Sequence, residues 1–172
     1  MIPKNTKKIV LFLLRNIEKT GYNINQIAKS LEISVGSSFK ILKELEKNKI
    51  VNAKNLGNAV FYTLNLDNTE TIKICELLLL EEKRNLTGYP KLYSEELIEF
   101  KAELIILFGS VLTKKQFNDV DVLFITNKVN ECSKFCLKLS KIRTKPIVPL
   151  ILKKENLIEE LKNEKEAIMS II

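Results

Sequence analysis

The chain has 172 residues, of which 45% are hydrophobic and 28% are charged, and its formal net charge is +7. This balance excludes a disordered chain, and the length suits one large or two small domains. Without histidine the chain has no Cys/His zinc site, and three cysteines give no disulfide framework. We expect a soluble cytoplasmic protein without a membrane partner, because the apolar runs at 9–14 and 77–80 are too short to span a bilayer.

The positive charge is concentrated at the start of the sequence. Residues 1–66 hold eleven basic and four acidic residues, a net charge of +7, whereas residues 67–172 hold seventeen of each. A local excess of this kind is typical of a module that binds a polyanion such as DNA. A general enrichment in lysine would have made both parts basic. We therefore expect residues 1–66 to form a DNA-binding domain.

Three helices are predicted in this first domain. Apolar residues at near-helical spacing predict a first, largely buried helix over 6–19. Asn23 is placed to cap a second helix over 24–31, and Ser34 is placed to cap a third helix over 35–48.

The third helix has a predicted core face and a predicted DNA-binding face. Its buried stripe is expected at Val35, Phe39, Leu42 and Leu45. The opposite face holds small hydroxyl side chains followed by lysines, which suits a helix that approaches base edges and phosphates in a groove. The residues of this helix and its cap that we expect to contact DNA are Ser34, Ser37, Ser38, Lys40, Lys43 and Lys47.

A β-hairpin is predicted after the third helix. The segments 50–53 and 59–64 are strand-like, and a Gly/Asn turn over 54–58 separates them. The turn residues that we expect to contact DNA are Lys54, Asn55 and Asn58.

Three helices followed by this hairpin resemble the winged helix-turn-helix domains of archaeal and bacterial transcription regulators. The stretch INQIAKSLEISVGSSFKILKELEKNKIV carries the resemblance. It implies a recognition helix in the major groove of double-stranded DNA and a wing near the minor groove. The alternative is a winged helix that makes only protein contacts, and the local positive charge disfavours it.

Residues 67–87 form a predicted connecting helix between two domains. This helix is apolar on nearly all sides, so something must bury it. Two ways of burying it remain open: packing between the two domains, or packing against the same helix of a second subunit in a homodimer. The sequence Gly88-Tyr89-Pro90 then predicts a break in the chain.

The remaining residues, 88–172, predict an α/β domain, and the chain as a whole is expected to be a two-domain α/β protein. A helix over 95–101 precedes a buried strand over 103–108, which ends at Gly109-Ser110. A second apolar strand begins at Asp119-Val120-Asp121. Because side chains two positions apart on a strand face the same side, these carboxylates suit a magnesium ion.

The second domain then predicts a helix with Cys132 and Cys136 on its inner face, a third strand over 146–152 and a closing helix over 155–172. Its segment LFGSVLTKKQFNDVDVLFI resembles the signature of the DNA polymerase β-type nucleotidyltransferase superfamily in its minimal form, and the likeness covers about residues 95–172. The resemblance implies a mixed sheet with helices. It also implies binding residues: Gly109 and Ser110 for a nucleoside triphosphate, and Asp119 and Asp121 for Mg²⁺.

The sequence departs from that family in two places. The loop before the aspartates has Lys114 and Lys115 but no glycine. The third carboxylate, which would act as the base in two-metal chemistry, is missing from the strand over 146–152, where Pro149 is near the expected position. No catalytic residue is therefore assigned, and Glu99 and Glu155 are the acids that could complete the site.

Three functions remain open. The first is a DNA-binding transcriptional regulator whose degenerate nucleotidyltransferase-like domain binds a magnesium-nucleotide or serves as a docking surface. The second is an active enzyme that transfers a nucleoside monophosphate to a protein or small molecule, as members of this family do in toxin-antitoxin pairs. The third is a purely architectural DNA-binding protein.

Overall fold

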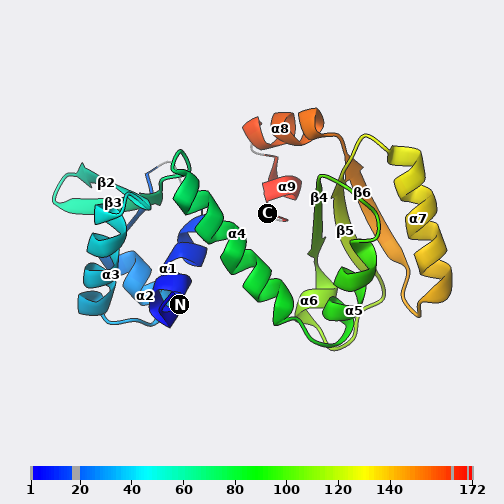
Figure 1. Ribbon diagram of the computed structural model, residues 1–172, viewed down its shortest axis with the longest axis horizontal. Coiled ribbons are helices and arrows are strands. Elements are labelled where there is room, and N and C mark those ends of the chain that lie inside the picture. Colours follow the sequence, from blue (N-terminus) through cyan, green and yellow to red (C-terminus); the bar gives the residue numbers. More distant parts are fainter. Residues whose placement is uncertain (1, 17–19, 164, 170, 172) are drawn as a thin grey trace. The chain divides into compact units, whose positions relative to one another are not determined.

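The computed structural model describes residues 2–16, 20–163, 165–169 and 171 (Figure 1). The chain forms two compact units, residues 1–82 and 83–172. The division falls inside the connector predicted at 67–87, because the helix in that region packs into the core of the first unit.

The described part of the first unit contains helices and a small antiparallel sheet. Its helices are α1 (Lys4–Arg15), α2 (Ile24–Leu31), α3 (Val35–Lys47) and α4 (Thr69–Arg84). Its strands are β1 (Tyr22–Asn23), β2 (Val51–Leu56) and β3 (Ala59–Leu64), in the order β1-β3-β2. Three helices followed by a hairpin that closes a three-stranded sheet are the elements of a winged helix.

Local capping explains where two of these helices begin, as predicted. The Asn23 side chain accepts a hydrogen bond of 3.0 Å from the Gln26 amide, and the Gln26 side chain accepts one of 2.8 Å from the Asn23 amide. This reciprocal pair satisfies two amides that a helix start leaves without acceptors. The Ser34 hydroxyl likewise accepts a hydrogen bond of 3.2 Å from the Ser37 amide at the start of α3.

The buried face of α3 differs from the predicted stripe. Ser38, Leu42 and Leu45 are buried, whereas Val35 is 51% exposed and Phe39 is 48% exposed. Residues three and four positions apart share a helix face, so Leu42 and Leu45 are compatible with either stripe. The prediction was wrong at the first two positions, where the small Ser38 faces the core and larger apolar residues face outward.

Helix α4 packs one face into the core of the first unit. Thr71, Cys75 and Leu78 are buried, and the Thr71 hydroxyl donates a hydrogen bond of 3.4 Å to the Ile50 carbonyl oxygen. Ile74 is half-buried against this core, whereas Ile72, Leu77, Leu79 and Leu80 are 42–52% exposed.

The hairpin turn is shorter than the predicted one. Lys54 pairs with Phe61 and Asn55 pairs with Val60, so both residues belong to strand β2. The turn is Gly57-Asn58, and Gly57 has a φ of +58°, which glycine adopts without steric cost. The two-residue strand β1, which completes the sheet, was not predicted because it is too short to give a pattern.

The described part of the second unit alternates helices and strands. Its helices are α5 (Gly88–Leu97), α6 (Ser110–Thr113), α7 (Val129–Ile142), α8 (Lys154–Lys162) and α9 (Glu166–Met169). Its strands are β4 (Leu104–Phe108), β5 (Val120–Ile125) and β6 (Ile147–Leu152). The sheet order is β4-β5-β6, with β4 antiparallel and β6 parallel to β5.

Helix α5 begins seven residues before the predicted start at 95. Pro90 lies in its first turn, where the missing N–H would have no acceptor within the helix, so the proline does not break it. The predicted closing helix is divided into α8 and α9; its positions 164, 170 and 172 lie outside the described residues.

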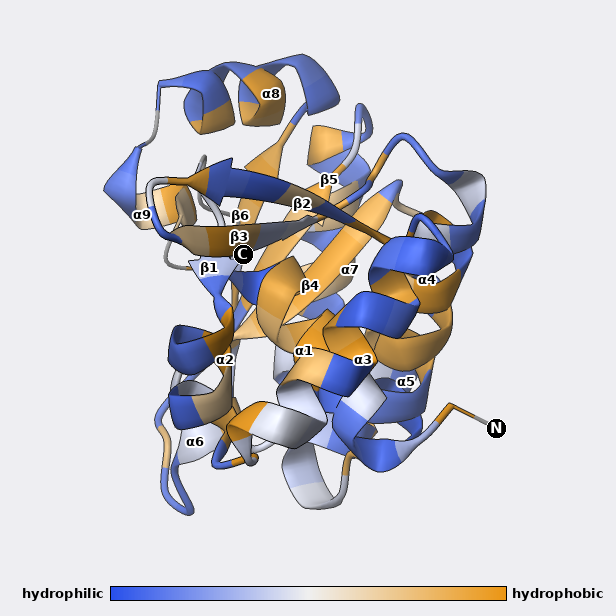
Figure 2. Ribbon diagram, turned by 90° about the vertical axis from the view of Figure 1, so that its left-hand side faces the viewer, coloured by the Kyte–Doolittle hydropathy of each residue, from blue (hydrophilic) through white to orange (hydrophobic). Residues whose placement is uncertain are grey.

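The central strand β5 is covered on both faces, and Figure 2 shows β4 and β5 largely in the hydrophobic colour. One face packs Val120, Val122 and Phe124 against α5 and α7, where Cys132 and Cys136 are buried as predicted. The opposite face packs Leu123 and Ile125 against side chains of the last two helices. Asp121 is two positions from Leu123 on the same strand, so it lies on this second face, and its side chain is half-buried.

Candidate nucleic-acid interface and metal site

The outward face of α3 is lined by lysines. Lys40, Lys43 and Lys47 are exposed and lie three and four positions apart, which places them opposite the buried Ser38, Leu42 and Leu45. Lys43 pairs with Glu46 at 2.8 Å, and this hydrogen bond raises the pKa of the Lys43 ammonium. The structure gives Lys40 and Lys47 no ion-pair partner among the residues it describes.

A glycine in the first turn of α3 lies on the same outward face. Gly36 is exposed, and apart from its chain neighbours and the backbone of its own helix, no described atom lies within 4 Å of the position that its Cβ would occupy. Packing therefore does not require a glycine there, although glycine costs about 1 kcal/mol relative to alanine inside a helix. Gly36 was not among the residues predicted from the sequence to contact DNA. A glycine in the first turn of a predicted helix is unfavourable, and that could have indicated it.

Ser38 does not belong to the DNA-binding face. Its side chain is fully buried and its hydroxyl has no hydrogen-bond partner among the described residues, so the prediction that it contacts DNA was wrong. The error follows from the rotation of α3: the face assigned to DNA included one position that faces the core. Ser34 is exposed, and Ser37 is half-buried.

The hairpin presents the other predicted DNA contacts. Lys54, Asn55 and Asn58 are exposed, two of them on β2 and one in the turn. Within the described ranges, Lys54 has no ion-pair partner. The hairpin residues predicted to contact DNA are therefore accessible.

The two units have similar net charges, and the uneven distribution of basic and acidic residues lies within the first unit. Residues 1–82 contain twelve basic and nine acidic residues, a net charge of +3, because residues 67–82 add five acids and one base; residues 83–172 have a net charge of +4. Two bases of α1 pair with α4, Lys7 with Glu81 and Arg15 with Glu82. The exposed Lys40, Lys47 and Lys54 have no ion-pair partner among the described residues, so the outward face of α3 and the hairpin are a candidate surface for a polyanion.

The candidate metal site lies where β4 ends beside β5. Phe108 is the register partner of Asp121, and Gly109 follows with a φ of +77°. A Cβ at position 109 would clash with the Asp121 carboxylate and lie 3.3 Å from its Cγ. The site therefore requires a glycine for two reasons, backbone conformation and space.

The two aspartates interact electrostatically. Burial, and then the nearby charge of Asp119, raise the pKa of the Asp121 carboxyl above its ordinary value. A raised pKa means that the ionised pair is unfavourable without a cation. Oxygen ligands of this kind are those that Mg²⁺ prefers in proteins.

The strand beside Asp121 supplies no acid. In the parallel pairing of β5 and β6, Val148 lies next to Asp121 and Pro149 lies next to Val122 on the opposite face, so the position expected for the third carboxylate is Val148. In the described part of the chain, no three His, Cys, Asp or Glu side chains are grouped as metal ligands. Neither Glu99 nor Glu155 thus completes the site.

The remaining residues of the predicted nucleotide site lie around this strand end. Ser110 is half-buried at the start of α6, and Lys114 and Lys115 in the following loop are exposed. The structure thus brings Gly109 and Asp121 into contact, with Ser110 next to them in the chain.

Comparisons with solved structures return bacterial proteins. Reduced HlyU from Vibrio cholerae is 28% identical, with 44% of this chain and 74% of that chain covered and a TM-score of 0.38. A mutant of ZitR from Lactococcus lactis is 18% identical, with 58% and 63% covered and a TM-score of 0.41. The homodimeric winged helix-turn-helix DNA-binding domain of a Mycobacterium bovis protein is 14% identical, with 49% and 73% covered and a TM-score of 0.39.

This chain spans less than two thirds of the ZitR chain that it matches. No family model matches the sequence, and no curated protein matches it as a relative. Because the TM-scores are below 0.5, the description of the first unit as a winged helix rests on its own elements. Across the described residues, the helices are too short or too polar to cross a membrane.

Proposed function

We propose that this chain is a DNA-binding transcriptional regulator that contacts double-stranded DNA through α3 and the hairpin β2–β3. The observation that carries the proposal is the outward face of α3, where Lys40 and Lys47 are exposed without ion-pair partners among the described residues and Gly36 leaves the backbone open. Lysines on one helix face neutralise phosphates, and an unobstructed first turn allows close approach to a groove.

The salt dependence of DNA binding tests this proposal. Each phosphate contact releases counterions, so the affinity for a mixed-sequence duplex falls steeply with salt, and removing one contact lowers the log–log slope by about 1. We expect Lys40→Ala and Lys47→Ala each to weaken binding and to reduce the slope. Lys73→Ala is the matched control, since Lys73 is an exposed lysine of α4. A slope near zero for the unmodified protein rejects the proposal.

We also propose that the second unit binds a magnesium-nucleotide rather than transferring its nucleotidyl group. The contact between Gly109 and Asp121, with Asp119 close by, supports binding of a metal-phosphate group at this strand end. Two-metal transfer needs a further carboxylate to activate the attacking hydroxyl, and Val148 takes the neighbouring position on β6.

Incubation with each labelled nucleoside triphosphate and Mg²⁺ separates binding from transfer. We expect saturable, magnesium-dependent binding that Asp119→Asn and Asp121→Asn each abolish, without a labelled protein or small-molecule product. Glu131→Gln is the control, because Glu131 is an exposed acid of α7. A labelled product that disappears in the aspartate variants establishes the alternative, an active nucleotidyltransferase, and absence of magnesium-dependent binding rejects both.

We further propose that the regulator acts as a homodimer. Ile72 and Leu79 lie seven positions apart on one exposed face of α4, where a second copy would bury them. Sedimentation of the full chain tests this proposal. We expect Leu79→Glu to produce a monomer, whereas Lys73→Gln, about 100° around the same helix from Ile72, leaves the mass unchanged; a monomeric unmodified protein rejects it.

A further inference from the structure

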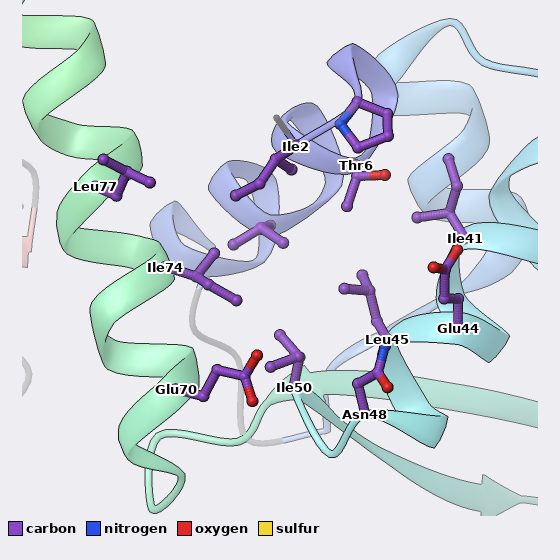
Figure 3. Close-up of a pocket in the computed structure, with 12 residues that line it drawn as sticks. Ile2, Thr6, Ile41, Glu44, Leu45, Asn48, Ile50, Glu70, Ile74 and Leu77 are labelled. Atoms are coloured by element: carbon purple, nitrogen blue, oxygen red, sulfur yellow. The ribbon is translucent and has the colours of Figure 1, made fainter.

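A groove of about 460 Å³ lies within the first unit (Figure 3). It is formed by the start of α1, the second half of α3, the residue before β2, and α4. Its volume is within the range of small-molecule sites, roughly 300–1,000 Å³. The residues that line it are Ile2, Pro3, Thr6, Val10, Ile41, Glu44, Leu45, Asn48, Ile50, Glu70, Ile74 and Leu77.

The walls of the groove are mainly apolar. Ile41 of α3 and Ile74 of α4 approach it from two sides, and Leu45 and Ile50 lie at its base (Figure 3). Leu45 and Ile50 also belong to the hydrophobic core of the unit, so this part of the groove is fixed by packing. An apolar surface held in place in this way favours a ligand with an apolar body.

Two carboxylates give the groove its charge. Glu44 and Glu70 come from different helices, and Figure 3 shows the Glu70 carboxylate turned towards the groove. Both residues are exposed, and the described part of the chain provides neither with an ion-pair partner. The described residues that line the groove include no lysine or arginine, although the unit as a whole is basic.

We propose that this groove binds a small organic cation with an apolar body, such as an arylalkyl ammonium ion. The apolar walls take up the body of the ligand, and the carboxylates of Glu44 and Glu70 accept hydrogen bonds from its ammonium group. An acid of the same shape binds more weakly, because its carboxylate would lie beside two like charges. This site is separate from the surfaces assigned to DNA and to the magnesium-nucleotide.

Three probes of one shape test the charge preference: 4-phenylbutylammonium, 4-phenylbutanol and 4-phenylbutyrate. We expect saturable binding of the ammonium probe to the full chain by calorimetry, with about tenfold lower affinity for the carboxylate probe, since tenfold corresponds to about 1.4 kcal/mol. Amide signals of Ile41 and Ile74 in an NMR titration are expected to shift with the ammonium probe.

Variants decide whether the two carboxylates cause the preference. We expect the double variant Glu44→Gln/Glu70→Gln to bind the ammonium and carboxylate probes within about twofold of each other, as a neutral groove would. Glu76→Gln, which removes a charge from α4 outside the groove, is expected to keep the full preference. Equal binding of the three probes to the unmodified protein, absence of saturable binding, or a preference retained in the double variant overturns the proposal.

Discussion

The α-carbon of Gly109 lies directly against the carboxylate of Asp121, so that any side chain at position 109 would clash with Oδ2. The antiparallel pairing of β4 with β5 creates this contact, since it aligns Phe108 with Asp121. The contact brings the backbone after β4 next to a carboxylate whose pKa is raised by burial and by Asp119. It is the main structural support for a metal-phosphate site in the second unit.

Gly109→Ala tests this contact. A Cβ at a φ of +77° is strained and displaces Asp121, so we expect loss of magnesium-dependent nucleotide binding and a destabilisation of about 1–3 kcal/mol. Gly88→Ala is the control, because Gly88 has a φ of +61° with nothing near its Cβ position. Retention of binding in Gly109→Ala contradicts the assigned site.

Asp121→Asn is expected to stabilise the metal-free protein at neutral pH. The folded-state pKa of Asp121 lies above its ordinary value of 3.8, so the ionised carboxylate costs stability at every pH above the raised pKa. The cost disappears as the pH falls through the raised pKa towards 3.8, and the advantage of the variant shrinks with it. Thermal unfolding at a series of pH values measures the difference.

The same variant is expected to lose any rise in melting temperature that Mg²⁺ gives the unmodified protein, because ligand binding stabilises only a folded state that retains its ligands. An equal effect of Mg²⁺ on both proteins would show that Asp121 is not a ligand.

Gly36→Ala separates stability from DNA binding. Alanine is favoured over glycine inside a helix and nothing obstructs the new methyl group, so we expect the free energy of unfolding to rise by up to about 1 kcal/mol. We also expect weaker binding to duplex DNA, because the methyl group projects from the face that approaches the groove. Chemical denaturation and a DNA titration measure the two effects; unchanged DNA affinity would remove Gly36 from the interface.

Ser38→Ala tests whether the buried Ser38 takes no part in DNA binding. The buried hydroxyl has no hydrogen-bond partner, so removing it should raise the free energy of unfolding by about 1–2 kcal/mol. DNA affinity is expected to change by less than about twofold, in line with an uninvolved position. Ser30→Ala on the exposed surface of α2 serves as the stability control, since it changes helix propensity alone. A large loss of DNA affinity in Ser38→Ala would show that Ser38 contributes to the DNA interface.

Local signals predicted most of the secondary structure. The caps Asn23 and Ser34 placed α2 and α3 because hydrogen bonds within a few residues decide where a helix begins. The rotation of α3 was not predictable in the same way. Val35 and Phe39 continue the helical spacing of Leu42 and Leu45, yet they face outward, because the neighbouring elements determine which face is covered.

The site in the second unit shows the same division. The sequence identified Gly109, Asp119 and Asp121 as a group, since Gly109 follows one apolar run that predicts a strand and the two aspartates begin the next. From the sequence, the position of the missing third carboxylate was expected near Pro149. The residue beside Asp121 on β6 is instead Val148, one position earlier. The sequence could not give this position, because the register of β6 against β5 depends on contacts between segments far apart in the chain.

The sequence by itself determined the elements of a helix-turn-helix with a hairpin and the two aspartates two positions apart, because these depend on residue type and short-range spacing. The tertiary structure alone decided that Gly109 lies against Asp121, that Ser38 faces the core, and that α4 packs into the first unit, whose net charge is +3. Each of these features depends on which surfaces pack against each other in the fold. Burial and strand register determine that packing, and a periodic sequence pattern does not specify them.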